Sequence, residues 1–146
     1  MTELNHAKGF RDLAVYQKAR KVSRAIFEIS KDFPREETYS LTNQIRRASR
    51  SIGAQIAEAW AKRRYERHFV SKLTDADAEQ METQHWIDEA HDCQYLNPKQ
   101  KEELTVELME VGQMLNSMID KAHSFCGQSN HMVRDETVEY LADTDD

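Results

Sequence analysis

Glycine, proline and cysteine are all scarce in this sequence of 146 residues, which holds four, two and two of them. With so few glycines, the chain has no material for a glycine-rich loop that would cradle a phosphate group. Nucleophile triads and cysteine pairs at zinc-binding spacing are also missing. These absences argue against an enzyme and against a resident cofactor.

A long hydrophobic run is absent as well, and 32% of the residues are charged. The longest apolar stretch is far too short to cross a bilayer, and the first residues lack the pattern of a secretion signal. We therefore expect a cytoplasmic protein without a membrane partner. Cys93 and Cys126 should lie at opposite ends of a bundle roughly 40 Å long, so we expect free thiols, which suit a reducing compartment.

The charges that are present are unevenly distributed along the chain. Residues 1–73 contain 16 Lys and Arg against 8 Asp and Glu, or +8, whereas residues 74–146 contain 4 against 18, or −14. Together these give the net charge of −6. A basic half can bind nucleic acid, but it can also lie against the acidic half, within a subunit or between subunits. We favour the second interpretation.

Apolar residues recur at spacings of three and four, which is typical of amphipathic helices, and strand-like alternation is absent. The pattern predicts four helices, over about 12–32, from 40 into the basic stretch 62–67, over 66–94, and from the Asn97-Pro98 cap to 125. Short turns make neighbouring helices antiparallel. We predict an all-α, antiparallel up-and-down four-helix bundle over 11–127, with an N-terminal arm, 1–10, and a short, acidic, mobile tail, 128–146.

One face of the predicted second helix is unusual, because small residues point away from the core. On a helical wheel this line consists of Gly53, Ala54, Ala57 and Ala61. Alanine is simply a good helix former, but small residues also let another backbone approach closely. We interpret this face as an oligomer interface. Arginines that acidic partners could bind lie at its edge, namely Arg46, Arg47 and Arg50.

Two further sets of residues are candidates for binding. The basic set, which could contact nucleic acid, extends beyond those three arginines to Lys62, Arg63, Arg64 and Arg67. Few aromatic residues are interleaved with it. The second set consists of polar residues on or beside the inner stripes, namely Gln55, Glu58, Gln80 and Thr83. We interpret these as a hydrogen-bond network that joins helices; the alternative is a small-ligand site.

Metal binding is the enzyme-class hypothesis that the sequence raises. Four histidines follow an acidic residue by three positions, in the pairs Glu3/His6, Glu82/His85, Asp88/His91 and Asp120/His123. Such pairs hold the metals of di-iron bundles when they point inward. On the helical wheel, however, Glu82, His85 and Asp120 point outward. We therefore expect surface pairs at i, i+3 and no metal.

Three stretches of the chain resemble a known family. They are GFRDLAVYQKA, then FPREETYSLTNQIRRASRSIGAQIAEA, then Glu82-Thr83-Gln84 with Leu96. Over about residues 8–125 the chain resembles the four helix bundle proteins first noticed in intervening sequences of bacterial 23S rRNA genes. The resemblance implies an up-and-down bundle that forms a ring-shaped homopentamer without established enzymatic activity. Some relatives, strongly basic accessory proteins of diversity-generating retroelements, bind nucleic acid and a reverse transcriptase.

The sequence departs from the family pattern at several small or polar positions. Gln55 and Ala59 stand where Asn and Gly are usual, Ser40 where Gly is usual, and Ala78-Glu79 where Gly-Ser is usual. We therefore predict a non-enzymatic homo-oligomeric scaffold or binding subunit of unknown role. The alternative is a nucleic-acid-binding accessory protein, associated with rRNA or a retroelement.

Overall fold

The computed structural model describes residues 7–126. Residues outside this range are the predicted acidic tail, 128–146, the first six residues of the predicted arm, and Gly127, the last residue of the predicted bundle. Within it the secondary structure is helical throughout, without strands. The long helices are α2 (Ala14–Ser30), α3 (Asn43–Ala61), α4 (Glu66–Asp92) and α5 (Pro98–Asp120). Shorter elements are η1 (Phe10–Asp12), η2 (Arg35–Glu37), η3 (Thr38–Thr42) and α6 (Ala122–Cys126).

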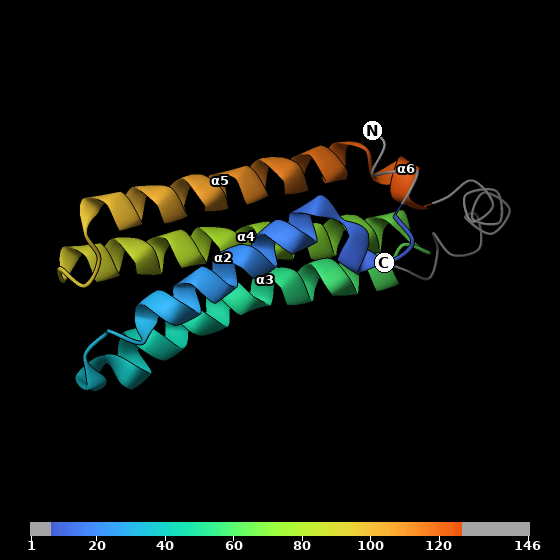
Figure 1. Cartoon of the computed structure of the whole chain (residues 1–146). Coiled ribbons are helices and arrows are strands. Elements are labelled where there is room, and N and C mark those ends of the chain that lie inside the picture. The colour runs from blue at the N-terminus through green and yellow to red at the C-terminus, as the bar shows by residue number, and fades with distance from the viewer. Residues whose placement is uncertain (1–6, 127–146) are drawn as a thin grey trace, which may run out of the picture.

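The four long helices run up and down beside one another, as Figure 1 shows. Contacts join α2 to α3, α3 to α4, α4 to α5 and α5 back to α2, which closes the bundle. The short helix α6 folds back against α4 at the end of the bundle where α2 begins and α3 ends. The all-α four-helix bundle predicted from the sequence is therefore confirmed.

The core consists of the apolar stripes that the 3.6-residue period places on one face of each helix. Phe69, the largest fully buried side chain, lies in α4 among isoleucines and leucines from all four helices. Full burial of one such side chain stabilises the fold by about 1.5–3 kcal/mol. The largest fully buried aliphatic side chains are Val22, Ile26, Ile45, Ile52, Ile56, Leu73, Ile87, Leu108, Val111 and Leu115.

Several helix boundaries differ from the prediction. Asp12 does not cap α2, because it belongs to the 3-10 turn η1 and its carboxylate accepts a hydrogen bond from the Lys8 N–H at 2.8 Å. A π-helical turn, η3, precedes α3, which therefore begins at Asn43 and not near Ser40. The predicted fourth helix is interrupted at Lys121 and continues as α6.

The turn between α4 and α5 is defined by two caps. The amide of Gln94 donates to the His91 carbonyl, and that of Tyr95 donates to the Ala90 carbonyl, both at 2.9 Å. This is the Schellman pattern that ends a helix, and it stops α4 at Asp92, before the predicted end at Gln94. Asn97 then starts α5 as predicted, in a capping box with Gln100.

Candidate binding surface on helices α2 and α3

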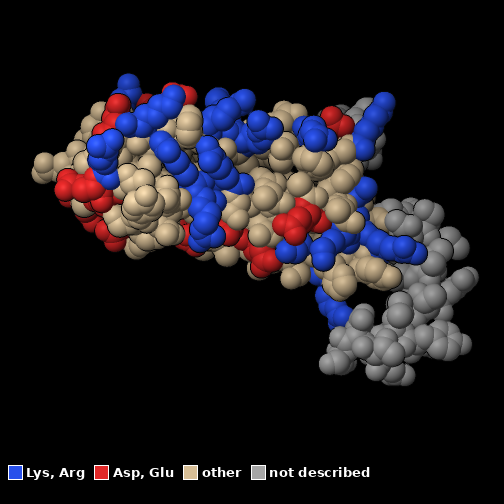
Figure 2. All heavy atoms as spheres, turned by 90° about the horizontal axis from the view of Figure 1, so that it is seen from below, with Lys and Arg blue, Asp and Glu red and all other residues tan. Residues whose placement is uncertain are grey.

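The two halves of the bundle carry opposite charge. Helices α2 and α3 hold seven Lys and Arg against two Glu, whereas α4 and α5 hold four Lys and Arg against thirteen Asp and Glu. Figure 2 shows lysine and arginine side chains gathered over the face on the α2–α3 side. The charge split in the sequence is thus also a split between two layers of the molecule.

Salt bridges across the seams use part of this charge within one chain. Lys18 on α2 lies 3.5 Å from Glu107 and 2.8 Å from Glu110 on α5. Arg47 on α3 lies 3.8 Å from Glu82 on α4. The hydrogen bond to Glu110 raises the pKa of Lys18 despite its partial desolvation. Basic and acidic helices therefore do pair inside the subunit, but most of the charge stays on the outer faces.

The predicted polar network joins helices at only two of its four residues. Lys72 on α4 extends to α3, where its Nζ lies 3.4 Å from Gln55 Oε1 and 3.5 Å from Glu58 Oε1. The hydrogen bonds of Gln80 and Thr83 stay within α4: Gln80 Nε2 donates to Asp77 at 3.0 Å, and Thr83 Oγ1 donates to the Glu79 carbonyl at 2.8 Å.

For Gln80 and Thr83 the expectation of an interhelical bond is therefore wrong. Both side chains are buried in α4, and a buried hydroxyl or amide can be satisfied by its own helix. The structure instead joins α4 to α5 through a residue that the sequence analysis did not select. Asn116 Nδ2 lies 3.5 Å from Asp77 Oδ2 and 2.8 Å from the Gly112 carbonyl.

The predicted small-residue face is only partly free. Ala54 and Ala61 are exposed and Ala57 is half-buried. Gly53, in contrast, packs against α2 of the same chain, because a Cβ placed there would lie 3.5 Å from the Tyr16 ring. The glycine thus serves the α2–α3 contact, and the line of alanines remains available to a neighbour.

A groove of about 470 Å³ runs between α2 and α3 beside this line of alanines. Its floor is made of small residues, and two aromatic rings, Phe10 and Tyr16, pack edge to face at 5.0 Å along it. Three guanidinium groups, from Arg20, Arg24 and Arg50, also line the groove. The remaining lining residues are Ala19, Ser23, Gly53, Ala54 and Ala57.

The arginines predicted as one basic patch have different surroundings. Arg46 Nε donates to Ser30 Oγ at 2.8 Å, and its guanidinium stacks over the Phe27 ring at 4.7 Å. Arg63 stacks over Trp60 at 3.6 Å, and burial lowers its pKa. Arg47 is paired with Glu82, so these three arginines each bind a group of their own chain.

Arg47, Arg50 and Arg64 are the exposed members of that patch, and of these Arg47 is paired with Glu82. Arg50 lines the groove and also lies 5.1 Å from the Phe27 ring. Arg20 and Arg24 were not predicted as site residues, although their spacing of four residues places them on one side of α2. That spacing was the available signal, but it could not show that α3 would bring Arg50 next to them.

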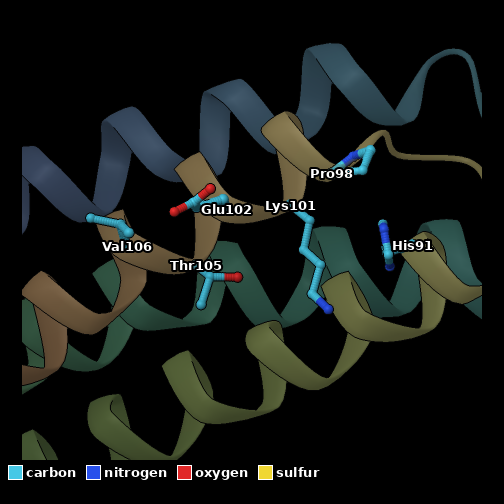
Figure 3. A pocket seen from close by; sticks show the side chains of 6 residues that line it. All are labelled: His91, Pro98, Lys101, Glu102, Thr105 and Val106. Atoms are coloured by element: carbon cyan, nitrogen blue, oxygen red, sulfur yellow. The ribbon is translucent and has the colours of Figure 1, made fainter.

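A second hollow, of about 390 Å³, lies where α4 ends and α5 begins (Figure 3). Lys101 and Thr105 extend from α5 toward α4, and His91 lies on α4 below Pro98. The Thr105 hydroxyl is buried without a hydrogen-bond partner among residues 7–126. Lys101 is held by Asp88 at 3.8 Å. Val106 and Glu102 complete the lining.

Within residues 7–126 no group of three or more His, Cys, Asp or Glu lies close enough to hold a metal ion. His85 pairs with Glu89 at 3.7 Å, and Glu82 accepts a hydrogen bond from the Trp86 indole at 3.1 Å. The Glu3/His6 pair lies outside the described residues. Neither Cys93 nor Cys126 forms a disulfide within the described residues. In the same range no helix is long and apolar enough to span a membrane.

These features define a four-helix bundle with a basic layer, an acidic layer and an arginine-lined groove. The family model of the 23S rRNA-intervening sequence protein matches residues 11–117, and the chain belongs to that family. A crystal structure from Bacteroides thetaiotaomicron, of a protein with unknown function from the S23 ribosomal protein family, has a similar fold. It is 28% identical, with a TM-score of 0.67, over 73% of this chain and 98% of that one. No curated protein matches this chain.

Proposed function

We propose that the protein is a non-enzymatic scaffold or binding subunit that assembles with copies of itself. The observation that carries this proposal is the separation of charge between the α2–α3 layer and the α4–α5 layer. Two basic faces would repel one another, whereas the basic face of one copy matches the acidic face of the next. An interface between two different faces repeats from copy to copy and closes into a ring when the rotation permits. A ring of five is the assembly that the resemblance implies.

The sizes of the exposed side chains also support pairing of the α2–α3 face with the α4–α5 face. The outer side of α3 presents the small residues Ala54, Ala57 and Ala61. The α4–α5 side exposes larger apolar side chains. The Met81 side chain is 58% exposed and that of Met109 is 52% exposed. Long, flexible methionines fill irregular gaps well, so they suit a partner face of small residues. Val106, 47% exposed, lies on the same layer.

The mass of the protein in solution tests this proposal. We expect sedimentation at micromolar concentration to give a particle several times heavier than the 17.1 kDa chain. Ala57→Glu should reduce it to a single chain with unchanged helix content by circular dichroism, because the larger, negatively charged side chain would oppose the acidic face of the next copy. Asn43→Glu, an exposed position at the start of the same helix, is the matched control and should keep the assembly. A wild-type particle of 17.1 kDa would overturn the proposal.

Binding of nucleic acid is the second candidate function, and the arginine-lined groove is the observation that favours it. Guanidinium groups bind phosphate in a bidentate geometry. Several copies of the groove in one assembly would strengthen a weak contact through multivalency. We expect the protein to retard RNA in a gel. The logarithm of its affinity for RNA should fall linearly with the logarithm of the salt concentration. The combined change Arg20→Gln, Arg24→Gln and Arg50→Gln should abolish it. Retardation that is unaffected by these three changes would exclude the groove as the site.

A further inference from the structure

The groove between α2 and α3 holds three cations without a counter-charge. Neither Arg20, Arg24 nor Arg50 forms an ion pair with any residue between 7 and 126. By contrast, Lys18 and Arg47, on the same two helices, each bind a carboxylate. Three neighbouring guanidiniums repel one another, and charge-assisted bonds to carboxylates would relieve this repulsion. The groove therefore fits a flexible acidic peptide.

The chain itself contains a peptide of this chemistry. Residues 127–146, which lie beyond the described part, carry six acidic side chains against a single arginine, Arg134. Three apolar residues stand among the acidic ones and could pack on the groove's small-residue floor, namely Val138, Tyr140 and Leu141. The acidic residues are Asp135, Glu136, Glu139, Asp143, Asp145 and Asp146.

The described part of the chain ends in α6, at the end of the bundle where α2 begins and α3 ends. Phe125 stacks at 5.6 Å on Phe69, which lies in the first turn of α4, shortly after the end of α3. From Arg63 back to Arg50 the helix rises by about 20 Å, at about 1.5 Å per residue. The nine residues from 127 to 135 can extend to about 30 Å. The first acidic residue, Asp135, can therefore reach Arg50, the groove arginine on α3, within one molecule.

We propose that residues 127–146 dock into the α2–α3 groove of their own chain. Carboxylates of the segment bind Arg20, Arg24 and Arg50, and its apolar residues cover the floor beside Tyr16. The docked segment occupies the groove that an acidic partner would need, and it covers Ala54 and Ala57 at the edge of the α3 face. The segment thus competes with whatever else binds this surface.

A nitroxide spin label on the segment tests the docking in the full chain. The label is attached at Thr144→Cys, which preserves all the acidic residues, with exposed Cys93 changed to Ser and buried Cys126 left in place. Met109→Glu on the α4–α5 face is added so that single chains are observed. We expect the amide signals of Ser23 and Gly53 to lose most of their intensity, while Gln113 on α5 keeps its signal.

The combined change Arg20→Gln, Arg24→Gln and Arg50→Gln should restore the lost signals. The matched control, Lys21→Gln, Arg35→Gln and Lys121→Gln, removes the same charge outside the groove and should leave the broadening unchanged. Equal broadening over the whole surface, or equal recovery in both triple variants, would overturn the proposal. So would broadening of unlabelled chains mixed with spin-labelled ones, which would show docking between molecules.

This test is separable from the proposed self-assembly. The mass of each sample is measured alongside its spectrum, so a Met109→Glu chain that still assembles, or a wild type that never does, counts against the proposed interface alone. The broadening pattern reports the groove in either case.

Discussion

Two helical glycines lie in opposite surroundings. A Cβ on Gly112 would lie 2.8 Å from the Gln80 amide nitrogen and 3.2 Å from Asp77, so α4 and α5 approach closely there. Gly53 has room, since its Cβ would meet Tyr16 at an ordinary 3.5 Å. The same substitution should therefore have opposite effects at the two positions.

We expect Gly112→Ala to lower the free energy of unfolding by about 1 kcal/mol, because displacing the buried, hydrogen-bonded Gln80 amide costs more than the helix preference of alanine returns. Gly53→Ala should raise it by about 0.5–1 kcal/mol, because alanine loses less entropy in a helix. Urea unfolding of both variants at one protein concentration measures the difference. Equal effects at the two sites would show that the α4–α5 contact is looser than the structure indicates.

The phenol of Tyr95 joins the turn after α4 to the turn before α3 through a hydrogen bond. Tyr95 Oη donates to Glu37 Oε2 at 2.7 Å, and Ser40 Oγ donates to Glu37 Oε1 at 2.7 Å. The hydrogen bonds from Ser40 and Tyr95 lower the pKa of Glu37. The hydrogen bond to Glu37, with desolvation, raises the pKa of Tyr95 to about 12.

The pH dependence of the Tyr95–Glu37 hydrogen bond follows from the pKa shifts of the two groups. Glu37 contributes fully above its ordinary pKa of 4.5, and its contribution is lost as the pH falls through the lowered value. Tyr95 contributes fully below 10, and its contribution is lost as the pH rises through about 12. Tyr95→Phe should therefore lower the Tm most between pH 5 and 9 and less at either extreme. Thermal melts that show a pH-independent difference would contradict this assignment.

At the scale of elements, the end of α4 contains a conformation that its residue does not favour. Gln94 has a φ of 65°, in the left-handed region where a side chain is strained. The position is the C′ residue of the Schellman cap, which is usually glycine. The hydrogen bonds of the cap thus hold a strained residue in place.

Gln94→Gly should relieve this strain and raise the free energy of unfolding by about 0.5–1 kcal/mol. Gln113→Gly, at an exposed position inside α5, is the matched control and should lower it by about 0.5–1 kcal/mol. Chemical unfolding of the pair decides the point. Destabilisation by Gln94→Gly would mean that the glutamine side chain makes a contribution larger than the backbone strain.

The elements also show how far sequence reasoning extends. The apolar stripes and the Asn97-Pro98 start were predictable, since they depend on local spacing and local capping. The turn η3 and the interruption at Lys121 were not, because tertiary packing fixes them. The groove was out of reach for the same reason: Arg20 and Arg50 become neighbours only when α2 packs on α3. Periodicity assigns a residue to a face, but it does not say which faces meet.

For the whole molecule, the central claim is that the basic α2–α3 face of one chain binds the acidic α4–α5 face of another. Two variants test it most directly, Ala57→Glu on the first face and Met109→Glu on the second. Each retains one intact face, so each alone should remain a single chain of 17.1 kDa. Mixed in equal amounts, they retain a single complementary pair of faces. Native mass spectrometry should then show a dimer of one chain of each variant and nothing larger; a mixture that stays at 17.1 kDa, or variants that still assemble alone, would contradict the account.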